Sequence, residues 1–251
     1  MPSSNQLYVD LSSYYDHFCR HIDYSDQCAF ANRVYGLFSE SSLQQYFDLA
    51  CGTGQHLKFM HGYGFEVSGL DNSQAMLDQA LIRCPSAKLL LCDLAEFENK
   101  SEFDLITCFL YSMHYSHPIL SFTQTLKRTY EALAPGGVFM FDMVDKFGIR
   151  NISDLIDRVE NDDEEMSFNS RWYYRGEGEV LDLFLDIQRK TAYGIQEWND
   201  RHTMTAVEII QVKNWMTEIG FEVTLLERDF QTIREWDGKS DNVIVVGQKL
   251  F

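Results

Sequence analysis

The sequence predicts an α/β fold with a mostly parallel sheet, and two observations support this prediction. Short apolar runs alternate five times with segments of helical character between residues 46 and 144. The first run leads directly into a glycine-containing turn, Asp48-Leu-Ala-Cys-Gly-Thr-Gly54, where a strand would enter a helix. Alternation of this kind implies right-handed crossovers and helices on both faces of the sheet.

The elements of this region can be assigned in order along the chain. Residues 12–38 are rich in aromatic side chains and predict one or two helices before the first strand. Strands are expected at Tyr46–Ala50, Phe65–Leu70, Ala87–Leu91, Phe103–Phe109 and Val138–Val144. Helices are expected between them at Gln55–Gly62, at Ser73–Cys84 with Ser73 as N-cap, and at roughly Pro118–Leu133.

The alternation of strand and helix stops after about residue 150. Ile149–Val159 is expected to form a short helix, and Glu160–Glu165 a solvated acidic loop. In the next segment the apolar residues repeat with a period of two, which predicts antiparallel strands with one covered face. These strands are expected at Arg171–Arg175, Glu179–Thr191 and Ile195–Thr205.

The end of the chain returns to the α/β pattern, which makes the strand-rich segment an insertion. A helix is expected at Ala206–Ile219, and strands at Phe221–Glu227 and Asp241–Gly247. We therefore expect four parts: a helical cap (1–45), a core (46–150), an inserted antiparallel β lid (151–205) and closing elements of the core (206–251).

Length and charge limit the classes of function. The 251 residues suffice for one large domain with an insertion, and 45% hydrophobic residues are ample for a packed core. With 38 acidic and 21 basic residues, the formal net charge is −17. A nucleic-acid substrate is disfavoured, because phosphate backbones bind clustered Lys and Arg.

The sequence also carries signals about compartment and partners. No apolar stretch approaches the roughly 20 residues of a membrane-spanning helix, and the N-terminus does not resemble a signal peptide. Six cysteines without a C-x-x-C pair are typical of free thiols in a reducing cytoplasm, and no H-E-x-x-H motif predicts a metal site. We expect a soluble cytoplasmic protein without a membrane partner or metal; its oligomeric state is open, a homodimer included.

Acidic side chains and a glycine turn are expected at one edge of the sheet. Asp48 belongs to the first strand, while Asp71 and Asp93 follow the second and third. Open α/β folds bind ligands at this carboxyl edge, and glycines let a ligand approach bare backbone. Leu57 stands where a dinucleotide site has its third glycine, which disfavours NAD. An acidic edge suits a cationic nucleoside without phosphates, such as S-adenosylmethionine.

Four motifs in this order and spacing resemble the class I S-adenosylmethionine-dependent methyltransferases. They are Asp48-Leu-Ala-Cys-Gly-Thr-Gly54, Gly69-Leu-Asp-Asn-Ser73, Cys92-Asp93 and Leu133-Ala-Pro-Gly-Gly137. The resemblance covers residues 40–145 together with the last helix and two strands. It implies a seven-stranded Rossmann-like sheet with a reversed last strand, and S-adenosylmethionine as the methyl donor.

The resemblance also implies roles for single residues. Gly52 and Gly54 would lie against the methionyl part of the donor, and Asp48 would support their turn. Asp71 would hold the ribose and Asp93 the adenine amine. Further donor contacts are implied at Tyr15, Ala50, Asn72, Met76, Leu94 and Phe109.

A narrower resemblance is to small-molecule N-methyltransferases that act on amino sugars or glycine. It is carried by Tyr14-Tyr15-Asp16, by the strand-rich insertion and by Asn199-Asp-Arg-His202-Thr-Met-Thr205. In those enzymes an N-terminal aromatic residue covers the donor, and the inserted sheet forms a lid over the acceptor. The resemblance implies a small-molecule acceptor methylated at nitrogen, without identifying it.

Candidate catalytic residues follow the fourth predicted strand. An amine acceptor must lose a proton, so a nearby His, Tyr or carboxylate is useful. We expect His114 to act as general base, with Tyr111 shaping the pocket and His202 acting from the lid; a structural role is the alternative for each. Trp172, Tyr174 and Trp198 would either wall the acceptor pocket or fill the core beneath the lid.

Two other functions compete with an active methyltransferase. One is an NAD-dependent oxidoreductase, against which the missing third glycine argues. The other is a module that binds S-adenosylmethionine without turnover, in which the space after the fourth strand would be closed to any acceptor.

Overall fold

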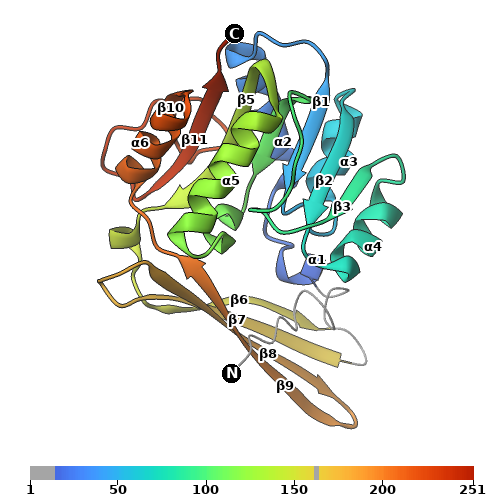
Figure 1. Cartoon of the computed structure of the whole chain (residues 1–251). Coiled ribbons are helices and arrows are strands. Elements are labelled where there is room, and N and C mark those ends of the chain that lie inside the picture. The colour runs from blue at the N-terminus through green and yellow to red at the C-terminus, as the bar shows by residue number, and fades with distance from the viewer. Residues whose placement is uncertain (1–14, 161–163) are drawn as a thin grey trace.

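The structure, a computed structural model, describes residues 15–160 and 164–251. Tyr14, part of the predicted N-terminal motif, lies outside these ranges. A seven-stranded sheet has the order β10-β11-β5-β4-β1-β2-β3 (Figure 1). Its strands are β1 (Gln45–Leu49), β2 (Glu66–Asp71), β3 (Lys88–Leu91), β4 (Phe103–Cys108), β5 (Leu133–Val144), β10 (Phe221–Glu227) and β11 (Asn242–Lys249).

The sheet is parallel except for its last strand in the chain. β1 pairs in parallel with β2 and β4, and β4 pairs in parallel with β5. β11 runs antiparallel to both β5 and β10, between which it lies. The predicted Rossmann-like sheet with a reversed final strand is therefore confirmed.

Helices cover both faces of this sheet, as the alternation of strand and helix predicts. They are α1 (Tyr15–Phe18), α2 (Tyr24–Phe38), α3 (Gln55–Gly62), α4 (Gln74–Arg83), α5 (Ile119–Ala132) and α6 (Ile209–Ile219). Side chains alternate across β1, so Tyr46 and Phe47 enter different cores. The core around Phe47 is closed by α5 and α6, and the core around Tyr46 by α2, α3 and α4.

Local signals in the sequence explain where several helices begin and end. Ser73 caps α4, because its hydroxyl accepts a hydrogen bond from the backbone N–H of Met76 at 3.3 Å. Gly220 follows α6 with a φ of 120°, which a residue with a Cβ adopts at a cost. None of the helices in the described ranges is long and apolar enough to cross a membrane.

A second sheet has four antiparallel strands in the order β6-β7-β8-β9. They are β6 (Ser153–Glu160), β7 (Glu164–Tyr174), β8 (Val180–Thr191) and β9 (Gly194–Thr205). The prediction of a helix at Ile149–Val159 is wrong, because most of that segment is β6, which pairs along its length with β7. A short segment with mixed polarity does not distinguish helix from strand, and pairing across the chain decides the outcome.

We refer to this four-stranded sheet as the lid sheet. Its inner face carries Leu181, Leu183, Leu185 and Ile187, as the period of two predicts. These side chains pack against Tyr15 and Phe18 of α1 and Tyr115 of the 3₁₀ helix η3 (Ser112–Tyr115). Figure 1 shows the lid sheet below the end of the seven-stranded sheet at which α1 lies.

Candidate active site

Three cavities meet where the lid sheet covers the carboxyl edge of the large sheet. The edge cavity, of about 110 Å³, lies at the ends of β1, β2 and β3. The turn cavity, of about 30 Å³, lies beside the turn after β1, and the lid cavity, of about 490 Å³, lies under the lid sheet. Tyr15 and Ser112 line all three, and Tyr115 lines both the edge and the lid cavity.

The edge cavity brings together most of the residues for which the resemblance implies a donor contact. They are Tyr15, Ala50, Gly52, Asp71, Asn72, Met76, Asp93 and Leu94. Asp93 accepts a hydrogen bond from the backbone N–H of Ala95 at 3.0 Å, which leaves its second carboxylate oxygen for another donor. Asp48 and Phe109 line the turn cavity instead.

Asp71 is held firmly in the edge cavity. Its Oδ2 accepts the backbone N–H of Gly52 at 2.9 Å, and its Oδ1 accepts the backbone N–H of Ser73 at 2.9 Å. Burial raises the pKa of the Asp71 carboxyl to about 6, although these N–H groups oppose the shift. Each oxygen keeps a second lone pair, so the carboxylate can accept from a pair of vicinal hydroxyls.

Asp48 presents a buried carboxylate oxygen to the turn cavity. Its Oδ1 accepts from the Thr107 hydroxyl at 3.3 Å, and its Oδ2 lies 3.6 Å from Nδ1 of His56. Within the described ranges Oδ2 accepts no hydrogen bond. A buried carboxylate in this state is stabilised by a cation, and the ammonium group of S-adenosylmethionine is one that fits.

The two glycines of the turn have different roles. Gly52, with a φ of 52°, lines the edge and turn cavities, where its lack of a side chain leaves backbone accessible. Gly54 lines none of the three cavities. A Cβ on Gly54 would lie 2.9 Å from Cβ of Ala80, so this glycine lets the start of α3 approach α4 closely.

The loop after β4 is held in an uncommon backbone conformation. Leu110 and Tyr111 both have a φ of 60°, which costs free energy for residues with a side chain. Asp142, fully buried in β5, offsets this cost: its Oδ1 accepts the Tyr111 backbone N–H at 2.9 Å. Its Oδ2 accepts from Nε of Arg228 at 2.8 Å, and the Arg228 guanidinium lies 4.6 Å from the centre of the Tyr111 ring.

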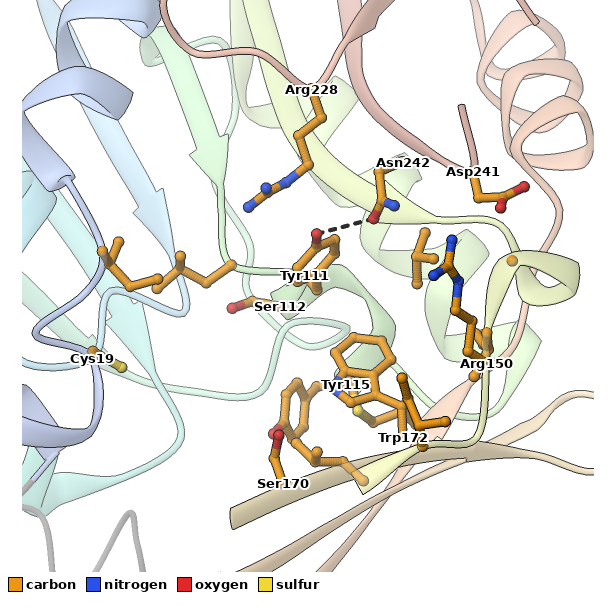
Figure 2. A pocket seen from close by; sticks show the side chains of 18 of the residues that line it. Cys19, Tyr111, Ser112, Tyr115, Arg150, Ser170, Trp172, Arg228, Asp241 and Asn242 are labelled. Carbon is orange, nitrogen blue, oxygen red and sulfur yellow. Dashed lines mark hydrogen bonds between the residues drawn. The ribbon is translucent and has the colours of Figure 1, made fainter. Parts of the chain in front are cut away.

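Tyr111 lines the lid cavity as expected, but its hydroxyl group is engaged. It donates a hydrogen bond to Oδ1 of Asn242 at 3.0 Å (Figure 2). Burial raises the pKa of Tyr111 to about 12, so the phenol stays protonated. This arrangement supports a role in shaping the cavity.

The structure argues against His114 as general base. Its ring is fully buried and lines none of the three cavities. Nδ1 lies 2.8 Å from the Thr205 carbonyl oxygen, and Nε2 accepts the backbone N–H of Val144 at 3.3 Å. Both ring nitrogens are therefore used to hold η3 against β5 and β9, and burial lowers the pKa of the ring.

His202 lies beside the cavities rather than on their walls. Its Nδ1 is 2.8 Å from the Tyr115 hydroxyl oxygen, and its Nε2 is 3.9 Å from Oδ2 of Asp200. Burial lowers the pKa of His202. The prediction that His202 belongs to the reacting groups stays a prediction, now with Tyr115 as the side chain through which it would act.

The aromatic residues of the lid divide between wall and core. Trp172 lines the lid cavity, with its ring centre 5.3 Å from that of Tyr111. Tyr174 is buried in the lid core, where its hydroxyl donates to the Gly178 carbonyl oxygen at 3.1 Å. Trp198 packs against the same core.

Several functional candidates cannot be recognised from the sequence. Figure 2 shows Arg150 and Arg228 on the lid cavity together with Ser112. No hydrogen bond or ion pair joins Arg150 to another residue of the described ranges. One signal was available: Asp142 is a carboxylate inside the apolar run of β5, which requires a partner such as Arg228.

Comparisons with known proteins agree with this geometry. Residues 47–137 match a family model described as a methyltransferase domain. A protein of Geobacillus sp. strain WCH70, provisionally named a methyltransferase, is 27% identical over 96% of this chain and 99% of its own. The dTDP-4-amino-2,3,4,6-tetradeoxy-D-glucose N,N-dimethyltransferase of Saccharopolyspora spinosa is 33% identical over 39% of this chain and 40% of its own.

Solved structures show the same fold over nearly the whole chain. A sugar N-methyltransferase from Streptoalloteichus sp. ATCC 53650 superposes with a TM-score of 0.80 at 19% identity, covering 94% of this chain and 93% of that one. The matched domain contains the strand ends that line the edge and turn cavities. The chain carries a methyltransferase domain and has the fold of S-adenosylmethionine-dependent methyltransferases.

Proposed function

We propose that this methyltransferase transfers a methyl group to the nitrogen of a small-molecule amine. The observation that carries the proposal is the lid cavity of about 490 Å³, which meets the edge cavity at Tyr15, Ser112 and Tyr115. A cavity of this size suits a small metabolite and not a folded macromolecule. The relatives named as amino-sugar N,N-dimethyltransferases support nitrogen as the methylated atom.

The donor would occupy the edge and turn cavities. In this placement Asp71 accepts hydrogen bonds from the ribose hydroxyls, and Asp93 accepts from the adenine amine. Asn72, Met76 and Leu94 flank the adenosine, while Gly52 and Ala50 contact the donor through backbone atoms. Asp48 stabilises the ammonium group from the turn cavity, next to Phe109.

S-adenosylmethionine supplies a methyl group on a sulfonium, which an acceptor lone pair attacks in line. Catalysis of such a displacement consists largely of positioning the acceptor and excluding water. Tyr15, Ser112 and Tyr115 stand where the two cavities meet, so they border the reacting atoms in this proposal. Trp172 and Tyr111, which also line the lid cavity, would hold the acceptor.

The charge on the lid cavity suggests what else the acceptor carries. Arg150, Arg228 and Asp241 line this cavity in a protein whose formal net charge is −17. Arg228 is paired with Asp142, so Arg150 is the guanidinium that would meet the acceptor. Guanidinium groups bind phosphate and carboxylate groups through paired hydrogen bonds. An amine that bears an anionic group, such as a diphosphate-linked amino sugar, fits this lining.

The competing functions receive less support. A module that binds the donor without turnover predicts a closed space after β4, whereas the lid cavity is open there. An NAD-dependent oxidoreductase is disfavoured by Leu57 and by the matched methyltransferase domain. The exclusion of nucleic-acid substrates and the oligomeric state stay predictions. Six free cysteines support function in the reducing cytoplasm.

The proposal is tested by measuring formation of S-adenosylhomocysteine from S-adenosylmethionine in the presence of small amines, with and without phosphate or carboxylate groups. Turnover that depends on an amine, with the methyl group found on nitrogen by mass spectrometry, is expected. Turnover of alcohols or carboxylic acids alone, or tight donor binding without turnover of any small molecule, would contradict it.

A further inference from the structure

Two titratable side chains are buried among the apolar residues on the inner face of the lid sheet, which also carries Ser170. Asp200 and His202 of β9 are 3% and 2% exposed, on the same face as Met204 and opposite Leu183 and Leu185 of β8. Placing a carboxylate and an imidazole in apolar surroundings is unfavourable unless other groups compensate for the lost hydration. Residues that only closed the lid core would be aliphatic, so this pair requires an explanation.

Tyr115 connects this pair to the place where the cavities meet. Its ring lines both the edge and the lid cavity, and its hydroxyl oxygen is 2.8 Å from Nδ1 of His202. Oδ2 of Asp200 lies 3.9 Å from the other ring nitrogen, Nε2. The three side chains thus form a row that runs from the cavities into the lid sheet.

We propose that Tyr115, His202 and Asp200 form a proton relay that deprotonates the acceptor amine. The inference rests on the proposed N-methylation and adds the group that removes the proton. Tyr115 is the catalytic residue of the three, since it borders the acceptor; His202 and Asp200 act through it.

The step balances in protons and electrons. A protonated amine gives one N–H proton to Oη of Tyr115, while the phenol passes its own proton to Nδ1 of His202. The amine lone pair then forms the N–C bond, and the electrons of the broken C–S bond remain on sulfur. The proton stays on His202 as an imidazolium beside the Asp200 carboxylate, and returns through Tyr115 to water after products leave.

The surroundings of His202 suit this role. Burial lowers its pKa, so the ring is neutral before turnover and can accept a proton. Asp200 opposes that shift and stabilises the imidazolium once it forms. Among the described residues, Tyr115 from η3 contacts one ring nitrogen and Asp200 from β9 lies nearest the other, while β8 presents Leu183.

Two other titratable groups near the cavities do not fit. Both ring nitrogens of His114 are engaged with backbone groups, and the Tyr111 hydroxyl donates to Asn242. Neither residue lines both the edge and the lid cavity. Tyr115 lines both cavities, and its hydroxyl group contacts the imidazole ring of His202.

The first test needs no substrate. The relay requires the His202 tautomer with its proton on Nε2, because Nδ1 must accept from the Tyr115 hydroxyl. Long-range ¹H–¹⁵N NMR of the imidazole rings, with His202→Gln to assign the signal, is expected to show this tautomer. The Nδ1 signal is expected to shift in Tyr115→Phe. A proton on Nδ1 in the wild-type protein would overturn the relay whatever the enzyme methylates.

The second test uses an amine found in the turnover assay. Tyr115→Phe and His202→Gln are expected to lower kcat by roughly 100-fold, the usual size of general-base effects, with donor affinity unchanged. The loss is expected to shrink as pH rises, because the free amine then no longer needs a base. Tyr174→Phe is the control: it removes a phenol hydroxyl of the lid sheet that lies away from the cavities, and kcat is expected to stay unchanged.

If the decrease in kcat of Tyr115→Phe is the same at every pH, or if only KM changes, the Tyr115 hydroxyl has a structural role. Either result would overturn the relay. Wild-type protein with the expected tautomer but without turnover of any amine would instead contradict the proposed function. The two failures are therefore distinguishable.

Discussion

The proposed donor side of the active site, formed by the edge and turn cavities, and the proposed acceptor side, formed by the lid cavity, differ in how the chain builds them. Most donor-side residues lie between Asp48 and Leu94, at the ends of three successive strands. The lid cavity draws on α1, the loop after β4, β7 and the segments around Arg228 and Asn242. The donor side is thus assembled by local chain turns, and the acceptor side by tertiary packing.

The two sides also differ in charge. Asp48, Asp71 and Asp93 give the donor side carboxylates, which suit a cationic ligand. The acceptor side carries Arg150 beside Asp241, and Arg228 is there paired with Asp142. A site divided in this way discriminates between its two ligands electrostatically, so substitutions on either side are expected to have separate effects.

The strongest challenge to this division is Asp71→Ala. Two ribose hydroxyl groups would lose a charged acceptor, at a cost of about 3 kcal/mol or more. Affinity for S-adenosylhomocysteine, measured by calorimetry, is expected to fall more than about 100-fold. Asp78→Ala, on the exposed side of α4, serves as the control. Unchanged affinity in a folded Asp71→Ala protein would show that the donor does not bind in the edge cavity.

Gly54→Ala tests whether the donor side depends on close packing of its turn. The new Cβ would lie 2.9 Å from Ala80, and the residue keeps a φ of 79°. We expect a loss of about 2 kcal/mol or more in the free energy of unfolding, measured by urea denaturation. Gly64→Ala is the matched control, because its φ is 94° and no atom lies within 4 Å of the added Cβ. Equal losses would show that backbone conformation alone matters.

The pH dependence of donor binding sharpens the role assigned to Asp71. Its pKa in the free protein is raised to about 6, and the ionised form is the one that accepts from both hydroxyls. Binding therefore competes with protonation: affinity is constant above this pKa and falls by up to about tenfold per pH unit below it. Calorimetry from pH 5 to 8 checks this. A flat profile in the wild-type protein would show that the carboxylate does not contact the donor.

The smallest expected effect is on the acceptor side. Arg150→Gln is expected to raise KM about fivefold for an amine with a phosphate or carboxylate group, through loss of a partly exposed charge pair. KM for a neutral amine and the affinity for the donor are expected to stay unchanged. Arg234→Gln, which pairs with Asp229 outside the cavities, is the control. An equal rise for neutral amines would disprove recognition of the anionic group.

What could be predicted from the sequence follows the same division. That Asp71, Gly52, Met76 and their neighbours line one cavity could be predicted, because a glycine turn and strand ends are local signals. Ser112, Arg150 and Arg228 were missed, because only packing of distant segments brings them to one cavity. No local pattern marks them.

The differences between prediction and structure have equally physical causes. The chemistry of His114 suits a base, but the identity of a residue does not reveal that backbone groups of Thr205 and Val144 occupy its nitrogens. β6 differs from the predicted helix, because eight residues of mixed polarity acquire their conformation from pairing with β7. The strands of the large sheet, with their strong apolar runs, left no such ambiguity.

The position of Tyr15 has a thermodynamic consequence. One aromatic ring borders all three cavities, so it is a shared boundary for both ligands. The free-energy change of ordering the Tyr15 ring occurs when the first ligand binds, and it does not occur again when the second ligand binds. By reciprocity, the factor by which bound donor changes acceptor affinity must equal the factor by which acceptor changes donor affinity.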